Sequence, residues 1–102
     1  MKGQEAVRRR LVALRANLPD GDIRAIPYVR EFHRRIRDLE QLGIDGATEF
    51  RIHEGEMRFA LKPKPGRYVE RAFFLAQLDA LILCLEPDSE GRRIGFTSIQ
   101  DR

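Results

Sequence analysis

Apolar residues recur every three or four positions in the first part of the chain, which is the spacing of one face of an α-helix. Between residues 4 and 18 these positions are Val7, Leu11, Leu14 and Leu18. Between residues 28 and 42 they are Val29, Phe32, Ile36 and Leu39, flanked by Tyr28 and Leu42. The pattern predicts two helices, each with a single apolar face. Because the connection between them is short, we expect them to lie antiparallel.

Residues that break or cap helices mark the ends of both segments. The turn signal Pro19–Gly21 follows the first segment. Pro27 suits the first turn of the second helix, where a backbone N–H would have no helical partner. Gly43 is expected in the left-handed conformation just past the end of that helix, so that Ile44 packs back on the last turn.

The segment from residue 69 to residue 85 is the most apolar part of the chain, and we expect a third helix over residues 68–85. Its only polar residues are Glu70, Arg71, Gln77 and Asp79. On a helical wheel the apolar side chains form two stripes on roughly opposite sides. The first stripe consists of Val69, Phe73, Ala76, Ala80, Leu83 and Cys84, and the second stripe consists of Phe74, Leu78, Leu81 and Leu85.

Two apolar stripes on one helix need two covering surfaces. In one interpretation, the two earlier helices cover both sides and leave nothing exposed. In the interpretation that we favour, the first stripe packs in the core of the chain and the second stripe is an interface for a partner protein. Asp79 is expected to pair with Arg71 or with an arginine of another helix, because a buried, unpaired carboxylate is costly.

Apolar and polar residues alternate from Met57 to Lys62, which predicts a short strand over residues 56–62. Ile94 and Phe96 permit a second strand that pairs with the first. The proline-containing stretch 62–66 is expected to be an extended linker to the third helix. The sequence therefore predicts an α+β fold, mainly α, in a single domain spanning residues 1–102. It is a three-helix bundle with a small two-stranded β-ribbon, and residues 99–102 form a frayed tail.

The charge balance is weakly basic, with 19 Lys and Arg residues against 16 Asp and Glu residues. Cationic side chains from separate segments would form a candidate contact surface for phosphate or for an acidic partner, if they converged. Those residues are Arg8, Arg9, Arg10, Arg15, Lys62, Lys64 and Arg67. No nucleic-acid recognition motif accompanies them. The arginines of the second helix alternate with acidic residues at the spacing of intrahelical ion pairs, so we interpret that face as solvated.

No combination of residues indicates catalysis, a metal site or a cofactor. His33 and His53 lack the neighbouring ligands that a metal ion needs. Cys84 lies in an apolar run, where the pKa of a thiol is raised rather than lowered. As the only cysteine it cannot form an internal disulfide, which favours a reducing compartment. The apolar run is also short for a membrane span. We expect a cytoplasmic protein that is not an enzyme, with no cofactor, no metal and no contact with a membrane.

The expected function is a non-enzymatic protein–protein interaction or self-association module, such as an adaptor or accessory subunit of a larger bacterial complex. Its partner would be a second copy of the chain or another subunit. The alternative is a nucleic-acid-binding accessory protein that uses the basic N-terminal helix.

Overall fold

The computed structural model describes residues 2–86 of the chain, and over these residues the fold is α+β and mainly helical. The three main helices are α1 (Lys2–Ala16), α2 (Arg30–Gln41) and α3 (Arg71–Cys84). The strands are β1 (Ile23–Arg24), β2 (Met57–Ala60) and β3 (Gly66–Val69). The predicted final strand around Ile94 and Phe96 and the predicted tail at residues 99–102 lie outside the described residues.

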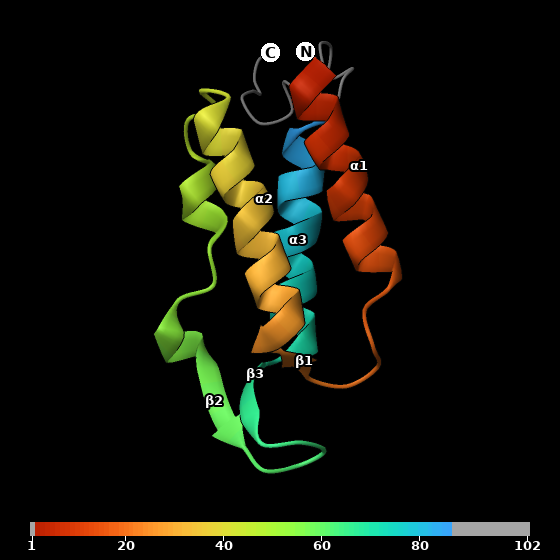
Figure 1. Ribbon diagram of the computed structural model, residues 1–102, viewed down its shortest axis with the longest axis vertical. Coiled ribbons are helices and arrows are strands. Elements are labelled where there is room, and N and C mark those ends of the chain that lie inside the picture. Colours follow the sequence, from red (N-terminus) through yellow and green to blue (C-terminus); the bar gives the residue numbers. More distant parts are fainter. Residues whose placement is uncertain (1, 87–102) are drawn as a thin grey trace, which may run out of the picture.

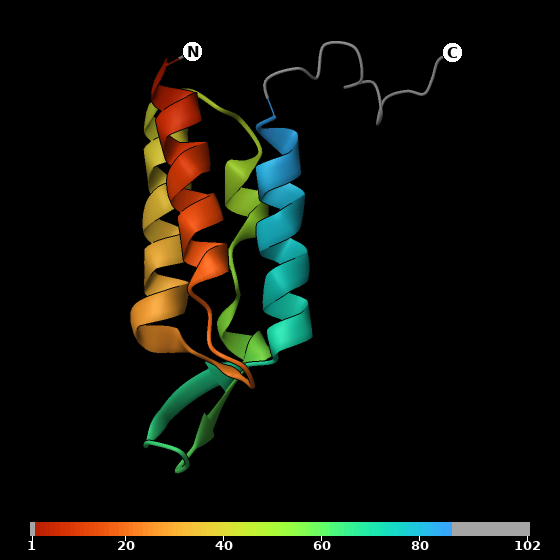
Figure 2. The ribbon, with the colours of Figure 1, turned by 90° about the vertical axis from the view of Figure 1, so that its right-hand side faces the viewer.

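The helices stand side by side as a bundle, with the sheet at one end (Figure 1). The first two helices run in opposite directions, as their short connection predicts, and α3 runs parallel to α2. Residues 44–56 descend between α2 and α3 as a fourth column that contains no α-helix (Figure 2). This column contains two short 3₁₀ turns, Ala47–Phe50 and Glu54–Glu56. The bundle therefore has four corners, and only three of them are helices.

The end of α2 has the predicted glycine cap. Gly43 adopts φ of 86°, a left-handed conformation that glycine reaches without steric cost. The Ile44 N–H donates to the Leu39 carbonyl at 3.0 Å, and the Gly43 N–H donates to the Glu40 carbonyl at 3.0 Å. This pair of bonds is a Schellman motif. It turns the chain back so that Ile44 packs against the core, which starts the fourth column.

The sheet has three antiparallel strands in the order β1-β3-β2, so the predicted two-stranded ribbon is wrong in its number of strands. The central strand is β3, in a stretch that the sequence pattern assigned to the linker and the start of the third helix. Its Val69 pairs with Ile23 on one side and with Met57 on the other. These three apolar residues lie on the same face of the sheet, and that face packs against the end of the helical bundle. Helix α3 therefore begins only at Arg71.

Hydrogen bonds to backbone carbonyls hold the loop between β2 and β3. The Tyr68 hydroxyl donates to the Lys64 carbonyl at 2.7 Å and accepts the Lys64 N–H at 3.3 Å. The Arg24 guanidinium donates to the Pro65 carbonyl at 2.7 Å, which ties β1 to the same loop. A side chain at Gly66 would lie only 3.1 Å from that guanidinium, so a glycine leaves the room that Arg24 needs.

The core reverses the roles predicted for the two stripes of α3. All four residues of the second stripe are buried: Phe74, Leu78, Leu81 and Leu85. They face the interior, where the Phe74 and Phe32 rings meet edge to face with centroids 5.3 Å apart. In the first stripe, Ala76, Ala80, Leu83 and Cys84 are exposed, Phe73 is half-buried, and the buried Val69 belongs to β3. The second stripe consists of larger residues, which fill the space between the four corners where alanines would leave voids.

Two leucines on opposite sides of α3 test this assignment. Leu78 is 0% exposed, so Leu78→Ala should lower the free energy of unfolding by about 2–5 kcal/mol. Leu83 is 68% exposed, so Leu83→Ala should change it by less than about 0.5 kcal/mol. Urea unfolding followed by circular dichroism measures both values. A larger loss for Leu83→Ala than for Leu78→Ala would contradict the assignment.

Candidate interaction surfaces

Among residues 2–86, the outer face of α3 is apolar, and the polar side chains of this helix have partners within the chain. Its exposed apolar positions are Ala72, Ala76, Ala80, Leu83 and Cys84. The polar side chains of the helix all bind within the chain. Arg71 donates to the Pro19 carbonyl at 2.9 Å, and Gln77 donates to the Phe50 carbonyl at 3.2 Å. A solvent-facing helix normally shows charged residues on this side. We call these five residues the outer α3 face.

Asp79 pairs with an arginine of another helix, one of the two arrangements that the sequence analysis expected. The Arg15 guanidinium donates to both carboxylate oxygens of Asp79, through Nε to Oδ1 and through Nη2 to Oδ2 at 3.1 Å. Hydrogen bonding to Asp79 raises the pKa of Arg15. Both side chains are about half exposed, so the pair fixes how α1 lies beside α3 but is not part of the core.

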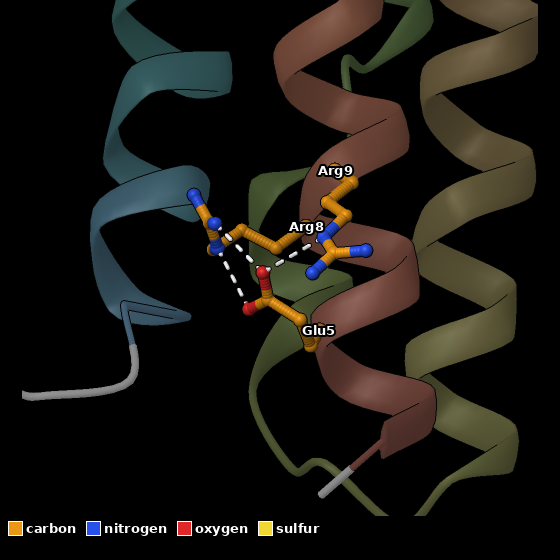
Figure 3. Close-up of polar contacts among 3 residues, drawn as sticks. All are labelled: Glu5, Arg8 and Arg9. Carbon is orange, nitrogen blue, oxygen red and sulfur yellow. Dashed lines mark hydrogen bonds and ion pairs between the residues drawn. The ribbon is translucent and has the colours of Figure 1, made fainter.

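A carboxylate and two arginines form a cluster near the start of α1 (Figure 3). Glu5 accepts two hydrogen bonds from Arg8, at 3.0 and 2.8 Å, and one from Arg9 at 3.2 Å. The hydrogen bond from Arg8 is the largest cause that lowers the pKa of Glu5 to about 2. Arg8 extends towards the end of α3, and the charge of Glu86 there also raises the pKa of Arg8.

This cluster predicts a specific pH dependence of stability. Because folding lowers the pKa of Glu5 from 4.5 to about 2, its contribution is complete above pH 4.5 and is lost as the pH falls towards 2. The stability difference between the native chain and Glu5→Gln should therefore shrink over that interval, as measured by thermal melting at successive pH values. Glu49→Gln is the matched control, since Glu49 makes no ion pair among residues 2–86. A difference that stayed constant from pH 6 to pH 2 would contradict the prediction.

The seven cations of the predicted phosphate or acidic-partner surface do not converge. Arg8, Arg9 and Arg15 are bound to carboxylates of the chain, as described above. Lys62, Lys64 and Arg67 lie in or beside the loop of the β2–β3 hairpin, at the opposite end of the bundle from the start of α1 (Figure 1). Arg67 also lies 3.5 Å from Glu54. Arg10 lines a separate depression between α1 and α2, beside Asp38. The condition under which these seven residues would form one contact surface, their convergence, is therefore not met.

A groove of about 590 Å³ runs between α2 and the column of residues 44–56. One wall is formed by four residues of α2: Arg30, His33, Arg34 and Arg37. The rest of the lining is formed by Ala25, Ile26, Val29, Ile52, Glu54 and Met57. We call it the α2 groove. The sequence analysis interpreted these arginines as a solvated face. Their spacing of four and three was the available signal, but nothing in the sequence showed that a second wall stands opposite them.

His33 joins α2 to the fourth column. Its Nε2 accepts the Ile52 N–H at 2.9 Å, which places the proton of the neutral ring on Nδ1. Burial is the largest cause that lowers the pKa of His33, followed by the charges of Arg51 and His53. The neutral form is therefore the one that suits this position, because a protonated ring has no lone pair for the Ile52 N–H.

Acidification should weaken the fold through His33. The pKa of His33 in the folded state lies below its ordinary value of 6.5, so the unfolded state takes up the proton first and stability falls as the pH drops below 6.5. His33→Gln keeps an acceptor for the Ile52 N–H but does not titrate. Urea unfolding between pH 7.5 and 5.5 should show a loss of stability for the native chain and a smaller loss for His33→Gln. Parallel losses for the two proteins would contradict this role.

Potential metal ligands and the thiol of Cys84 are groups in residues 2–86 that bear on whether the chain could carry out chemistry. Within residues 2–86 no three His, Cys, Asp or Glu side chains are placed to hold a metal ion. Burial raises the pKa of the Cys84 thiol, which agrees with the predicted direction and makes the thiol a poorer nucleophile. None of the helices in this part of the chain is long and apolar enough to cross a membrane.

Comparison with known proteins finds no family model that matches the sequence, no matching curated protein and no matching solved structure.

Proposed function

We propose that this chain is a non-enzymatic protein–protein interaction module that contacts its partner through the outer α3 face, and that the partner is a second copy of the chain. The observation that carries the proposal is the outer α3 face itself. It consists of five exposed apolar residues on a helix whose polar side chains are bound within the chain. A helix that is apolar all round is normally covered on every side.

The shape of the outer α3 face favours a second copy. Leu83 projects at one end, and Ala72 and Ala76 leave a shallow surface at the other end. When two such helices lie antiparallel about a two-fold axis, the leucine of each packs on the alanines of the other. One surface patch then supplies both sides of the contact, as a two-fold interface requires. Alanines also let the two helix backbones approach closely, which increases the dispersion contacts between them.

Self-association would add stability to this small fold. A chain of 102 residues builds a modest core, and small domains often gain stability by association. The four-cornered bundle covers α3 on its inner side only, and α3 forms one edge of it (Figure 2). In this proposal the chain acts as an adaptor or accessory subunit of a larger complex, and association places two copies of the α2 groove and of the hairpin in one particle.

Substitution on the outer α3 face tests the proposal. Ala76→Glu with Leu83→Glu introduces charges that an apolar helix contact cannot accommodate, so the variant should be monomeric and remain folded. The matched control is Val12→Glu with Leu61→Glu, which places two glutamates at exposed apolar positions of α1 and the hairpin loop. Analytical ultracentrifugation over micromolar to millimolar concentrations should show dimers for the native chain and for the control. A native chain that stays monomeric throughout would refute self-association.

The single cysteine reports the orientation of the two helices. In the antiparallel arrangement, Cys84 of one copy lies level with Ala72 of the other. The two sulfurs are then separated by about 18 Å along the helix axes, because each residue rises about 1.5 Å. Spin labels on Cys84, measured by pulsed electron–electron double resonance, should give one distance of roughly 20–30 Å once label length and helix separation are included. Labels in direct contact would indicate parallel helices and overturn the antiparallel arrangement.

A further inference from the structure

The α2 groove carries more positive charge than its chain neutralises. Arg30 and Arg37 form no ion pair among the residues that the structure describes. Arg34 lies 3.8 Å from Glu31, which also lies 3.3 Å from the buried Arg35. Glu54 is the acidic residue of the opposite wall, and it lies 3.5 Å from Arg67. One wall of the groove is therefore a row of guanidinium groups with little internal compensation.

The side of the groove opposite the arginines is mainly aliphatic, with Glu54 as its charged residue. Ile26 is 56% exposed, although an isoleucine gains free energy when it is removed from water. Met57 is half-buried and stands across the groove from the arginines. A methionine side chain adapts to differently shaped apolar groups, which suits a binding surface. The groove thus offers a cationic wall and an apolar wall that face the same volume.

We infer that the α2 groove binds an extended acidic segment of a partner protein, with carboxylates against Arg30, Arg34 and Arg37 and apolar side chains against Ile26 and Met57. Arg30 and Arg37 lie about 10 Å apart along the helix axis, since each residue rises about 1.5 Å. An extended peptide alternates its side chains between two sides. It can therefore direct acidic residues to one wall and apolar residues to the other.

The same features disfavour a nucleic acid as the occupant. Single-stranded nucleic acids are bound by stacking bases on aromatic side chains, and the groove is lined by no phenylalanine or tyrosine. Guanidinium groups bind carboxylates and phosphates alike through two parallel hydrogen bonds. The apolar side chains opposite the arginines therefore favour a peptide, because a nucleic-acid backbone has no aliphatic side chains to place against Ile26 and Met57.

A pair of matched peptides tests the inference. The probe is a fluorescein-labelled peptide of sequence (Glu-Leu-Glu-Ser)3, and the control peptide replaces every Glu by Gln. Fluorescence anisotropy at low ionic strength should show binding of the acidic peptide, with an affinity at least about tenfold higher than that of the glutamine peptide. Added salt should weaken the binding. A labelled twelve-residue oligothymidylate is measured in parallel, and tighter binding of the oligonucleotide than of the peptide would overturn the inference.

Charge-matched variants locate the binding. Arg30→Gln with Arg37→Gln should lower the affinity for the acidic peptide at least about tenfold, because each substitution removes a charged hydrogen-bond donor from the groove. Arg10→Gln with Lys64→Gln removes the same net charge outside the groove and should retain the affinity. Equal losses in both variants, or no binding by the native chain, would refute the inference.

Amide chemical-shift mapping gives a readout that does not depend on the variants. On addition of the acidic peptide, the largest shifts should fall at residues 30–37 and 52–57, the two walls of the groove. Shifts concentrated in α1 or in the hairpin loop would contradict the location. The glutamate variant of the outer α3 face keeps the groove intact and should still bind the peptide, so the failure of one proposal is distinguishable from the failure of the other.

Discussion

The number of apolar stripes on α1 and α2 limits how α3 can be covered. Each of these helices buries one face, and both faces point to the same interior. Together with the column of residues 44–56, they pack against one side of α3, and among residues 2–86 nothing covers its other side. The enclosed side holds the larger residues, with Phe74 against Phe32 at its centre. The side of α3 that is buried also determines where its polar residues lie, because they flank that side. They form hydrogen bonds with the turn after α1, with the fourth column and with Arg15.

The charges of the chain serve three separate purposes. At the start of α1, Glu5 accepts hydrogen bonds from two arginines, and Arg8 extends towards the end of α3. Midway along the bundle, Arg15 and Asp79 fix α1 beside α3. Among residues 2–86, the outer side of α2 is where several arginines lie close together with few carboxylates to pair with them. An excess of three positive charges over the whole chain therefore says little about binding, because the distribution of the charges decides which of them are available.

The sequence correctly predicted the elements that depend on local patterning. It did not predict the features that depend on contacts between segments far apart in the chain. The single stripes of α1 and α2 and the cap at Gly43 depend on neighbouring residues, and all are confirmed. The pairing of β3 with β1 and β2 joins segments far apart in the chain, and Tyr68 and Val69 gave only a weak strand signal. For α3, both stripes were apolar, so periodicity could not choose between them. Residue volume could have done so, since one stripe contains Ala76 and Ala80 where a core needs bulk. The α2 groove could not be predicted from the sequence, because its second wall comes from residues 52–57, which only the fold places opposite α2.

The pairing of Ile23 with Val69 also determines the order in which the chain can assemble. As the chain emerges from the ribosome, α1 and α2 are complete early. Strand β3, which lies between β1 and β2, and the buried stripe of α3 come later. Closing so long a loop costs conformational entropy before any contact is gained. Until residues 66–85 have been added, the apolar faces of α1 and α2 can cover only each other, and incompletely covered apolar surface favours aggregation.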